Sequence, residues 1–176
     1  MCKDFVHLHL HSQYSLLDGA IKFDELFDEV GKQGMSSVAL TDHGNLFGAY
    51  DFYKKAKDNG VKPIVGCEIY IAKDHTNKSS ENNKTHHLTV LAQNLEGYEN
   101  LCSLVSIGHL RGFYRKPRVD KKLLFEKSDG LIVLSGCLNG EVCHNILKGK
   151  KDEAIKIAAE YKSVLKDRYF IEIQGT

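Results

Sequence analysis

Four features are absent or scarce in this sequence of 176 residues, and each of them argues against a class of protein. No apolar run is long enough to span a bilayer, so we expect no membrane partner. The five cysteines form no C-x-x-C pair, and their odd number favours free thiols in a reducing, cytoplasmic setting. The first residues enter an apolar run at once, which predicts no signal peptide. The net charge is only +1, whereas a dedicated nucleic-acid module carries a stronger basic bias.

What the sequence does contain is an alternation of apolar runs and helical stretches. Strands are predicted near residues 5–9, 37–41, 62–72, 87–92, 131–135 and 169–173. Helices are predicted near residues 23–32, 45–58, 97–110, 120–126, 141–147 and 152–165, and residues 73–85 form a polar loop. Near-continuous apolar strands that alternate with helices are typical of an α/β fold, in which helices cover a parallel sheet.

Side chains that commonly bind metals follow several of these apolar runs. His43, Glu68 and Cys137 stand at the ends of the second, third and fifth predicted strands. In parallel α/β folds, functional groups gather at the carboxyl ends of the strands. Imidazole, carboxylate and thiolate groups at one such edge make a hydrolytic metal site the leading hypothesis.

The first run contains His7, His9 and His11, and side chains two residues apart on a strand share a face. Two or three of these imidazoles can therefore converge on one point. His7 lies deepest in the run and is the best candidate for a purely structural role. A buried carboxylate without a partner is costly, so Glu68 is interpreted as a bridging ligand between two cations, or else as half of an ion pair with a lysine or arginine.

Other candidates have to be weighed against ordinary structural roles. Asp42 fits a turn or cap residue better than a ligand, whereas for His43 we favour ligation, because Gly44 allows a sharp turn. His86 and His87 are neighbours on a strand, so only one of them can face the centre. The remaining histidines with no supporting neighbours are treated as ordinary surface or helix residues: His75, His109 and His144.

Residues 111–118 form a basic, aromatic segment with the sequence RGFYRKPR. Such a segment can hold phosphates or stack a base. A solvated loop whose aromatic side chains pack down is the preferred interpretation at this point.

Several motifs together resemble the polymerase and histidinol phosphatase (PHP) domain family, in the form found in bacterial DNA polymerase III alpha subunits. They are HLHLHS at 7–12, TDHGNLFG at 41–48, KPIVGCE at 62–68, HLTVLA at 87–92, GFY at 112–114 and LSGC at 134–137. The resemblance covers essentially the whole chain, residues 1–176. It implies a distorted (β/α) barrel, here truncated before its last strands, with a cluster of divalent metal ions at the strand ends.

Carried over motif by motif, the resemblance implies a set of metal ligands and two residues that assist catalysis. The ligands are His9, His11, Asp18, His43, Glu68, His87 and Cys137. Zinc suits this mixture best, with manganese or iron as alternatives. His43 and Asp42 are the residues expected to assist proton transfer.

The function implied by the resemblance is that of an N-terminal domain of a replicative DNA polymerase. In related proteins such a domain can act as a metal-dependent phosphoesterase or as a 3′–5′ exonuclease in proofreading, and the resemblance implies DNA, through the full-length polymerase, and other replicase subunits as partners. Two alternatives stay open: a non-catalytic scaffold that stabilises the polymerase, and a stand-alone phosphatase of the histidinol-phosphate type. The incomplete barrel predicts an exposed sheet edge and weak activity.

Overall fold

The computed structural model describes residues 5–16, 18–80 and 83–175. In chain order the helices and strands are α1 (Phe23–Lys32), β1 (Ser37–Leu40), α2 (Ala49–Asp58), β2 (Lys62–Ala72), β3 (Thr85–Ala92), α3 (Leu95–Leu110), β4 (Arg118–Asp120), α4 (Lys121–Glu126), β5 (Leu131–Leu134), α5 (Glu141–Leu147), α6 (Lys151–Leu165), the 3-10 helix η2 (Lys166–Arg168) and β6 (Tyr169–Phe170). The expected α/β alternation is therefore present.

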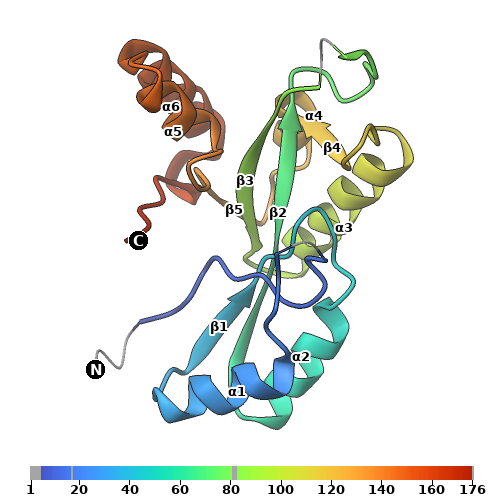
Figure 1. The fold of residues 1–176 in the computed structure, drawn as a ribbon, viewed down its shortest axis with the longest axis vertical. Coiled ribbons are helices and arrows are strands. Elements are labelled where there is room, and N and C mark those ends of the chain that lie inside the picture. Colours follow the sequence, from blue (N-terminus) through green and yellow to red (C-terminus); the bar gives the residue numbers. More distant parts are fainter. Residues whose placement is uncertain (1–4, 17, 81–82, 176) are drawn as a thin grey trace.

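A six-stranded sheet runs through the molecule in the order β1-β2-β3-β5-β6, and β4 pairs with β2 (Figure 1). The pairs β1/β2, β2/β4 and β5/β6 are parallel, but β3 is antiparallel to both β2 and β5. The prediction of an all-parallel sheet was therefore wrong. The described residues between β2 and β3 contain no α-helix, so the chain returns beside itself as a long hairpin instead of crossing over.

Some predicted boundaries also differ from the structure. Residues 5–10 lie beside β1 but form no regular strand; His7 O accepts a hydrogen bond from Ala39 N at 2.8 Å. α2 begins at Ala49 and not at Asn45, whose side chain instead donates to Tyr14 O. β4, with three residues, is too short to produce a sequence pattern, and β6 ends sooner than predicted.

The first helix packs as its sequence pattern predicts. Its apolar residues at spacings of three and four are all buried, and they face α2 and β1: Phe23, Leu26, Phe27 and Val30. The ring of Phe52 on α2 lies 5.7 Å from that of Phe23 and 5.6 Å from that of Phe27. This cluster holds α1 and α2 against β1.

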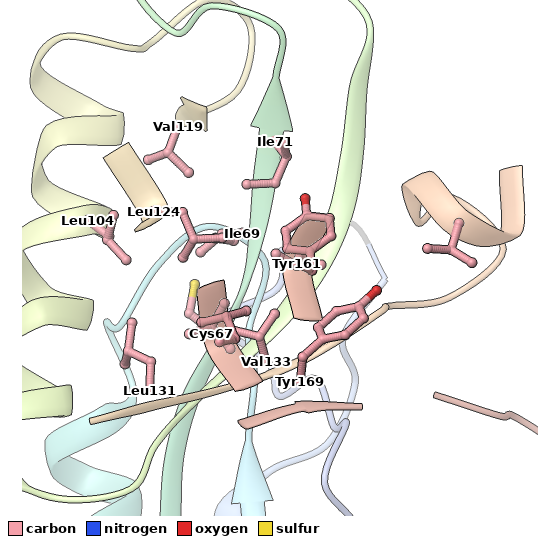
Figure 2. Packing of buried hydrophobic residues seen from close by; sticks show 14 of the residues in the cluster. Cys67, Ile69, Ile71, Leu104, Val119, Leu124, Leu131, Val133, Tyr161 and Tyr169 are labelled. Atoms are coloured by element: carbon pink, nitrogen blue, oxygen red, sulfur yellow. The ribbon is translucent and has the colours of Figure 1, made fainter. Parts of the chain in front are cut away.

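The larger core lies on one face of the β2–β3 hairpin. Cys67, Ile69 and Ile71 of β2 point toward this core, which also takes Leu104 from α3 and Tyr161 from α6 (Figure 2). Each fully buried aliphatic side chain contributes about 1.5–3 kcal/mol to folding. Because strand side chains alternate, the even-numbered residues of β2 are directed to the opposite face. No helix in the described part of the chain is both long and apolar enough to cross a membrane.

Candidate metal centre

Glu68 stands at the middle of the site, on the face of β2 opposite the large core. Its side chain is 1% exposed. The register of the hairpin pairs Glu68 with Thr89 and Tyr70 with His87, so these four side chains share one face. The turn after β1 reaches the same place, because Gly44 N donates to Glu68 O at 2.9 Å. Two separate parts of the sheet therefore converge on one carboxylate.

Four imidazoles surround that carboxylate. His43 Nδ1 lies 2.6 Å from Glu68 Oε2, and His87 Nδ1 lies 2.7 Å from Glu68 Oε1. His11 Nε2 is 3.3 Å from Oε2, and His9 Nε2 is 3.7 Å from Oε1. Two groups of three potential ligands result, and Glu68 belongs to both of them. One carboxylate shared by two such groups is the arrangement expected of a bridging residue.

Asp18 and Cys137 extend the cluster at two sides. Asp18 Oδ2 lies 2.9 Å from His43 Nε2 at the more exposed side. Cys137 Sγ lies 3.8 Å from both Glu68 Oε1 and His87 Nδ1. The hydrogen bond with His87 lowers the pKa of the Cys137 thiol, which favours the thiolate form that binds metals.

The structure thus brings together all seven residues predicted as ligands: His9, His11, Asp18, His43, Glu68, His87 and Cys137. His7 lies outside the cluster, and its exposed ring contacts Phe5. His86 is directed to the other side of β3, where its Nδ1 lies 3.2 Å from Asn139 O.

Two residues of the site were missed by the sequence reasoning. Glu172 Oε1 lies 2.6 Å from His9 Nδ1, and Thr89 Oγ1 lies 3.2 Å from the same nitrogen. Thr89 could have been found from its spacing, because it stands two residues after His87 on one strand. Glu172 lies within the last predicted strand, but its partner is 163 positions away, and no local pattern links the two.

Asp42 does not contact the imidazole cluster through its carboxylate. The residue is 1% exposed, and its oxygens accept hydrogen bonds from Ser12 N at 2.7 Å, Ser12 Oγ at 2.8 Å and Ser15 Oγ at 2.7 Å. These bonds hold the turn between His11 and Asp18. The geometry therefore gives Asp42 a positioning role close to the turn interpretation considered above.

Charges in the cluster are strongly coupled. Burial by itself would raise the pKa of Glu68, but contacts with His43, His87 and His9 hold it well below its ordinary range. Burial likewise opposes the charged form of His9, yet its contacts with Glu172 and Glu68 raise its pKa to about 10. The raised pKa values of His9, His43 and His87 favour their protonated forms around the buried anion, whereas burial lowers the pKa of His11. A bound cation would take the place of those protons.

Unsatisfied atoms within the cluster test whether a cation fits. His43 Nδ1 and Glu68 Oε2 are close, but they are not aligned for a hydrogen bond. Among the described residues, both atoms and His11 Nδ1 are buried without a hydrogen-bond partner. Orphaned buried polar atoms of this kind are costly, and metal coordination would satisfy them. The donors are nitrogen, oxygen and sulfur, which suits a divalent transition metal.

A third group of possible ligands lies elsewhere and has a structural explanation. His75 Nδ1 lies 2.5 Å from Asp120 Oδ2, and Asp120 Oδ1 accepts from Leu123 N at the start of α4. His75 was expected to be an ordinary surface residue, and the structure shows it instead in this pair. His109 also has a partner, because its Nε2 lies 2.9 Å from Gly44 O.

An α/β fold with a centre of histidines and carboxylates at its strand ends agrees with the family to which the sequence motifs pointed. The chain belongs to the PHP domain family, whose model it matches over residues 7–176. It is 48% identical to the DNA polymerase III subunit alpha of Helicobacter pylori, over 97% of this chain and 15% of that protein. It is 47% identical to the subunit of the same name from Thermus aquaticus, over 97% of this chain and 14% of that protein.

The chain thus spans about 15% of the length of the curated relatives it matches. Among solved structures, it is similar to a two-domain protein from Bacteroides vulgatus, described as containing a predicted PHP-like metal-dependent phosphoesterase. That match has a TM-score of 0.45 and 16% identity, and it covers 88% of this chain and 48% of the other.

Proposed function

We propose that this chain is the metal-binding PHP domain of a replicative DNA polymerase of the DNA polymerase III alpha type, and that its centre hydrolyses phosphodiester bonds. The observation that carries the proposal is the set of four imidazoles around the buried carboxylate of Glu68. The identity of 48% to a DNA polymerase III subunit alpha supports the same conclusion. DNA would be the substrate, as for a 3′–5′ exonuclease, and other replicase subunits would be partners.

The metal would be zinc, with manganese or iron as alternatives, because zinc accepts nitrogen, oxygen and sulfur ligands together. His9, His11 and Glu68 would hold one ion, and His43, Glu68 and His87 a second one. When bound, a divalent cation polarises a phosphodiester and lowers the pKa of a coordinated water.

The chain's own residues would handle protons and position the reacting groups. His43 lies between Asp18 and Glu68, with one ring nitrogen toward each carboxylate. It can therefore keep or pass a proton at the more exposed side of the site, where the Asp18 side chain is 58% exposed. Asp42 would hold the turn that carries Asp18, and its predicted part in proton transfer stays a prediction.

The two alternative functions make different demands on the site. A stand-alone phosphatase of the histidinol-phosphate type is disfavoured by the high identity to DNA polymerase III alpha subunits. A non-catalytic scaffold would keep the fold, and even a metal, but would hydrolyse nothing.

The deciding experiment combines metal analysis with a hydrolysis assay. The protein is purified without chelators, and its metal content is measured by mass spectrometry. Hydrolysis of a 3′-labelled single-stranded oligonucleotide is then compared between the wild type and His43→Asn. Bound metal together with hydrolysis would support the proposal if His43→Asn reduces the rate at least about 100-fold. This variant removes both a proposed ligand and an acid–base group, and loss of one acid–base group alone costs about 10²–10⁴-fold. Bound metal without hydrolysis in the wild type would favour the scaffold.

A further inference from the structure

The segment between α3 and β4 concentrates positive charge next to the candidate metal centre. Residues 111–118, called the basic loop below, contain the exposed cations Arg111, Arg115 and Lys116 and no acidic residue. Within the described part of the chain, none of these three makes an ion pair with a carboxylate. The whole chain carries a net charge of only +1, so this concentration of charge is local.

The ring of Tyr70 lies between Lys116 and the imidazoles of the candidate metal centre. Its Nζ lies 4.4 Å from the centroid of the Tyr70 ring. That ring in turn stacks at 13° and 6.0 Å on His43 and meets the edge of His87 at 5.1 Å. A cation over an aromatic face is held by the quadrupole of the ring. An exposed ammonium is therefore fixed beside the imidazoles that would bind the metal.

The basic loop is held in place by buried contacts. Arg118 is fully buried, and its Nε donates to Gly112 O at 3.0 Å. Gly44 has φ +63°, and a Cβ built on it would come within 2.7 Å of Pro117 Cγ and 3.1 Å of Tyr70 Cε2. The turn that carries His43 and the basic loop are thus in direct contact. A surface that is already positioned loses less entropy when it binds a ligand.

Aromatic side chains lie beside the same turn. His109 Nε2 donates a hydrogen bond to Gly44 O, and the His109 ring lies 6.2 Å from both Phe47 and Phe113. Phe47 is 69% exposed and Phe113 is 47% exposed. Proteins that bind single strands combine such exposed rings, on which bases stack, with cations that follow the phosphates. If an apolar protein partner bound here, the three cations of the basic loop would have no negatively charged group to pair with.

We propose that the basic loop and Phe47 form a binding surface for single-stranded DNA beside the metal centre. Lys116 contacts the phosphate nearest the centre, Arg115 contacts a neighbouring phosphate, and Phe113 and Phe47 stack bases. The inference rests on the proposed function, because it assumes that the substrate of the centre is a polynucleotide. The interpretation of residues 111–118 as a solvated loop with its aromatic side chains packed down does not hold for Phe113, which is exposed, whereas Tyr114 is half-buried.

Binding is measured separately from hydrolysis. The probe is a fluorescein-labelled oligothymidylate with phosphorothioate linkages at its 3′ end, and the readout is fluorescence anisotropy over a range of salt concentrations. Lys116→Gln and Arg115→Gln should each weaken binding several-fold and reduce the salt dependence by about 0.7, the slope per phosphate contact on a single strand. Phe113→Ala should weaken binding by about 5- to 150-fold, because stacking of one base contributes about 1–3 kcal/mol.

Lys156→Gln is the matched control, because Lys156 lies on α6 with a side chain 76% exposed. It should bind the oligonucleotide as the wild type does. Circular dichroism shows whether each variant is folded. Wild-type affinity and salt dependence in Lys116→Gln, Arg115→Gln and Phe113→Ala would overturn the proposal. Equal affinity for a duplex of the same length would overturn the stacking role of the rings, because duplex bases are not accessible to them.

Failure of the proposed function would look different. A wild-type protein that binds the oligonucleotide through the basic loop but never hydrolyses an unmodified one would contradict the phosphoesterase and leave the binding surface supported. Hydrolysis with binding that is insensitive to the three substitutions would contradict the binding surface alone.

Discussion

The two faces of the β2–β3 hairpin are built on the same backbone, yet they carry different kinds of side chain. One face carries Cys67, Ile69, Ile71, Leu88 and Val90 and is buried under the helices. The other carries Glu68, Tyr70, His87 and Thr89 and forms the floor of the candidate metal centre. The alternation of strand side chains allows adjacent residues to serve stability and chemistry separately.

The two faces also differ in how well they tolerate substitutions. A hydrophobic core accepts swaps that conserve volume at a cost below about 1.5 kcal/mol. A cluster of buried charged groups depends on each partner, because removal of one leaves another charge uncompensated. Substitutions at neighbouring positions of the hairpin should therefore separate stability from metal binding.

The largest expected effect is that of Ile69→Ala on the core face. Ile69 is 3% exposed, so truncation leaves a cavity and should lower the free energy of unfolding by about 2–5 kcal/mol. Urea denaturation without metal measures the effect. Ile155→Ala on α6 is the control; its side chain is 57% exposed, and a change within about 0.5 kcal/mol is expected. Equal losses for the two variants would contradict the core assignment.

Glu68→Gln should have the next largest effect, this time on metal binding. The neutral amide cannot supply the negative charge shared by the two ligand groups, so we expect affinity to fall by about 100-fold, or about 2.8 kcal/mol. Competition with a metal-binding dye measures this. Glu153→Gln, with a side chain 54% exposed on α6, should bind metal as the wild type does. Unchanged affinity in Glu68→Gln would show that the carboxylate is not a ligand.

The two neighbouring histidines of β3 give a paired test. His87→Ala removes a group 2.7 Å from Glu68, and metal content should fall by about tenfold or more. His86→Ala removes a ring that contacts Asn139 and His144, away from the centre, and should leave metal content unchanged. If His86→Ala were the variant that lost metal, the assignment of the two faces of β3 would be reversed.

Thr89→Val should have the smallest effect and the most local one. The substitution keeps the shape of the side chain but removes the hydroxyl that lies 3.2 Å from His9 Nδ1 and 3.3 Å from Glu172 Oε2. Loss of one such hydrogen-bonding group costs about 0.5–1.5 kcal/mol, which corresponds to a decrease in metal affinity of about 2- to 12-fold. Thr85→Val at the start of β3 is the control for the strand. A loss as large as that of Glu68→Gln would mean that Thr89 does more than orient His9.

Much of the site could be predicted because its residues follow local patterns. The spacing of His9 and His11, the turn residue after His43 and the place of Glu68 at the end of an apolar run are visible in the sequence. Asp18 was different, since only the resemblance to a family pointed to it. Glu172 was missed because its contact with His9 joins the two ends of the chain, and no periodicity encodes such a contact.

By itself, the sequence determined the α/β alternation, the buried faces of the helices and most of the ligand types, because these depend on periods of two or 3.6 residues and on side-chain chemistry. Only the tertiary structure decided the direction of β3, which runs antiparallel to both β2 and β5 and makes the sheet mixed. It also decided that Glu172 reaches His9 and that Lys116 lies over Tyr70 beside His43. Such contacts join segments far apart in the chain, so the packing of the whole fold selects them and local preferences do not.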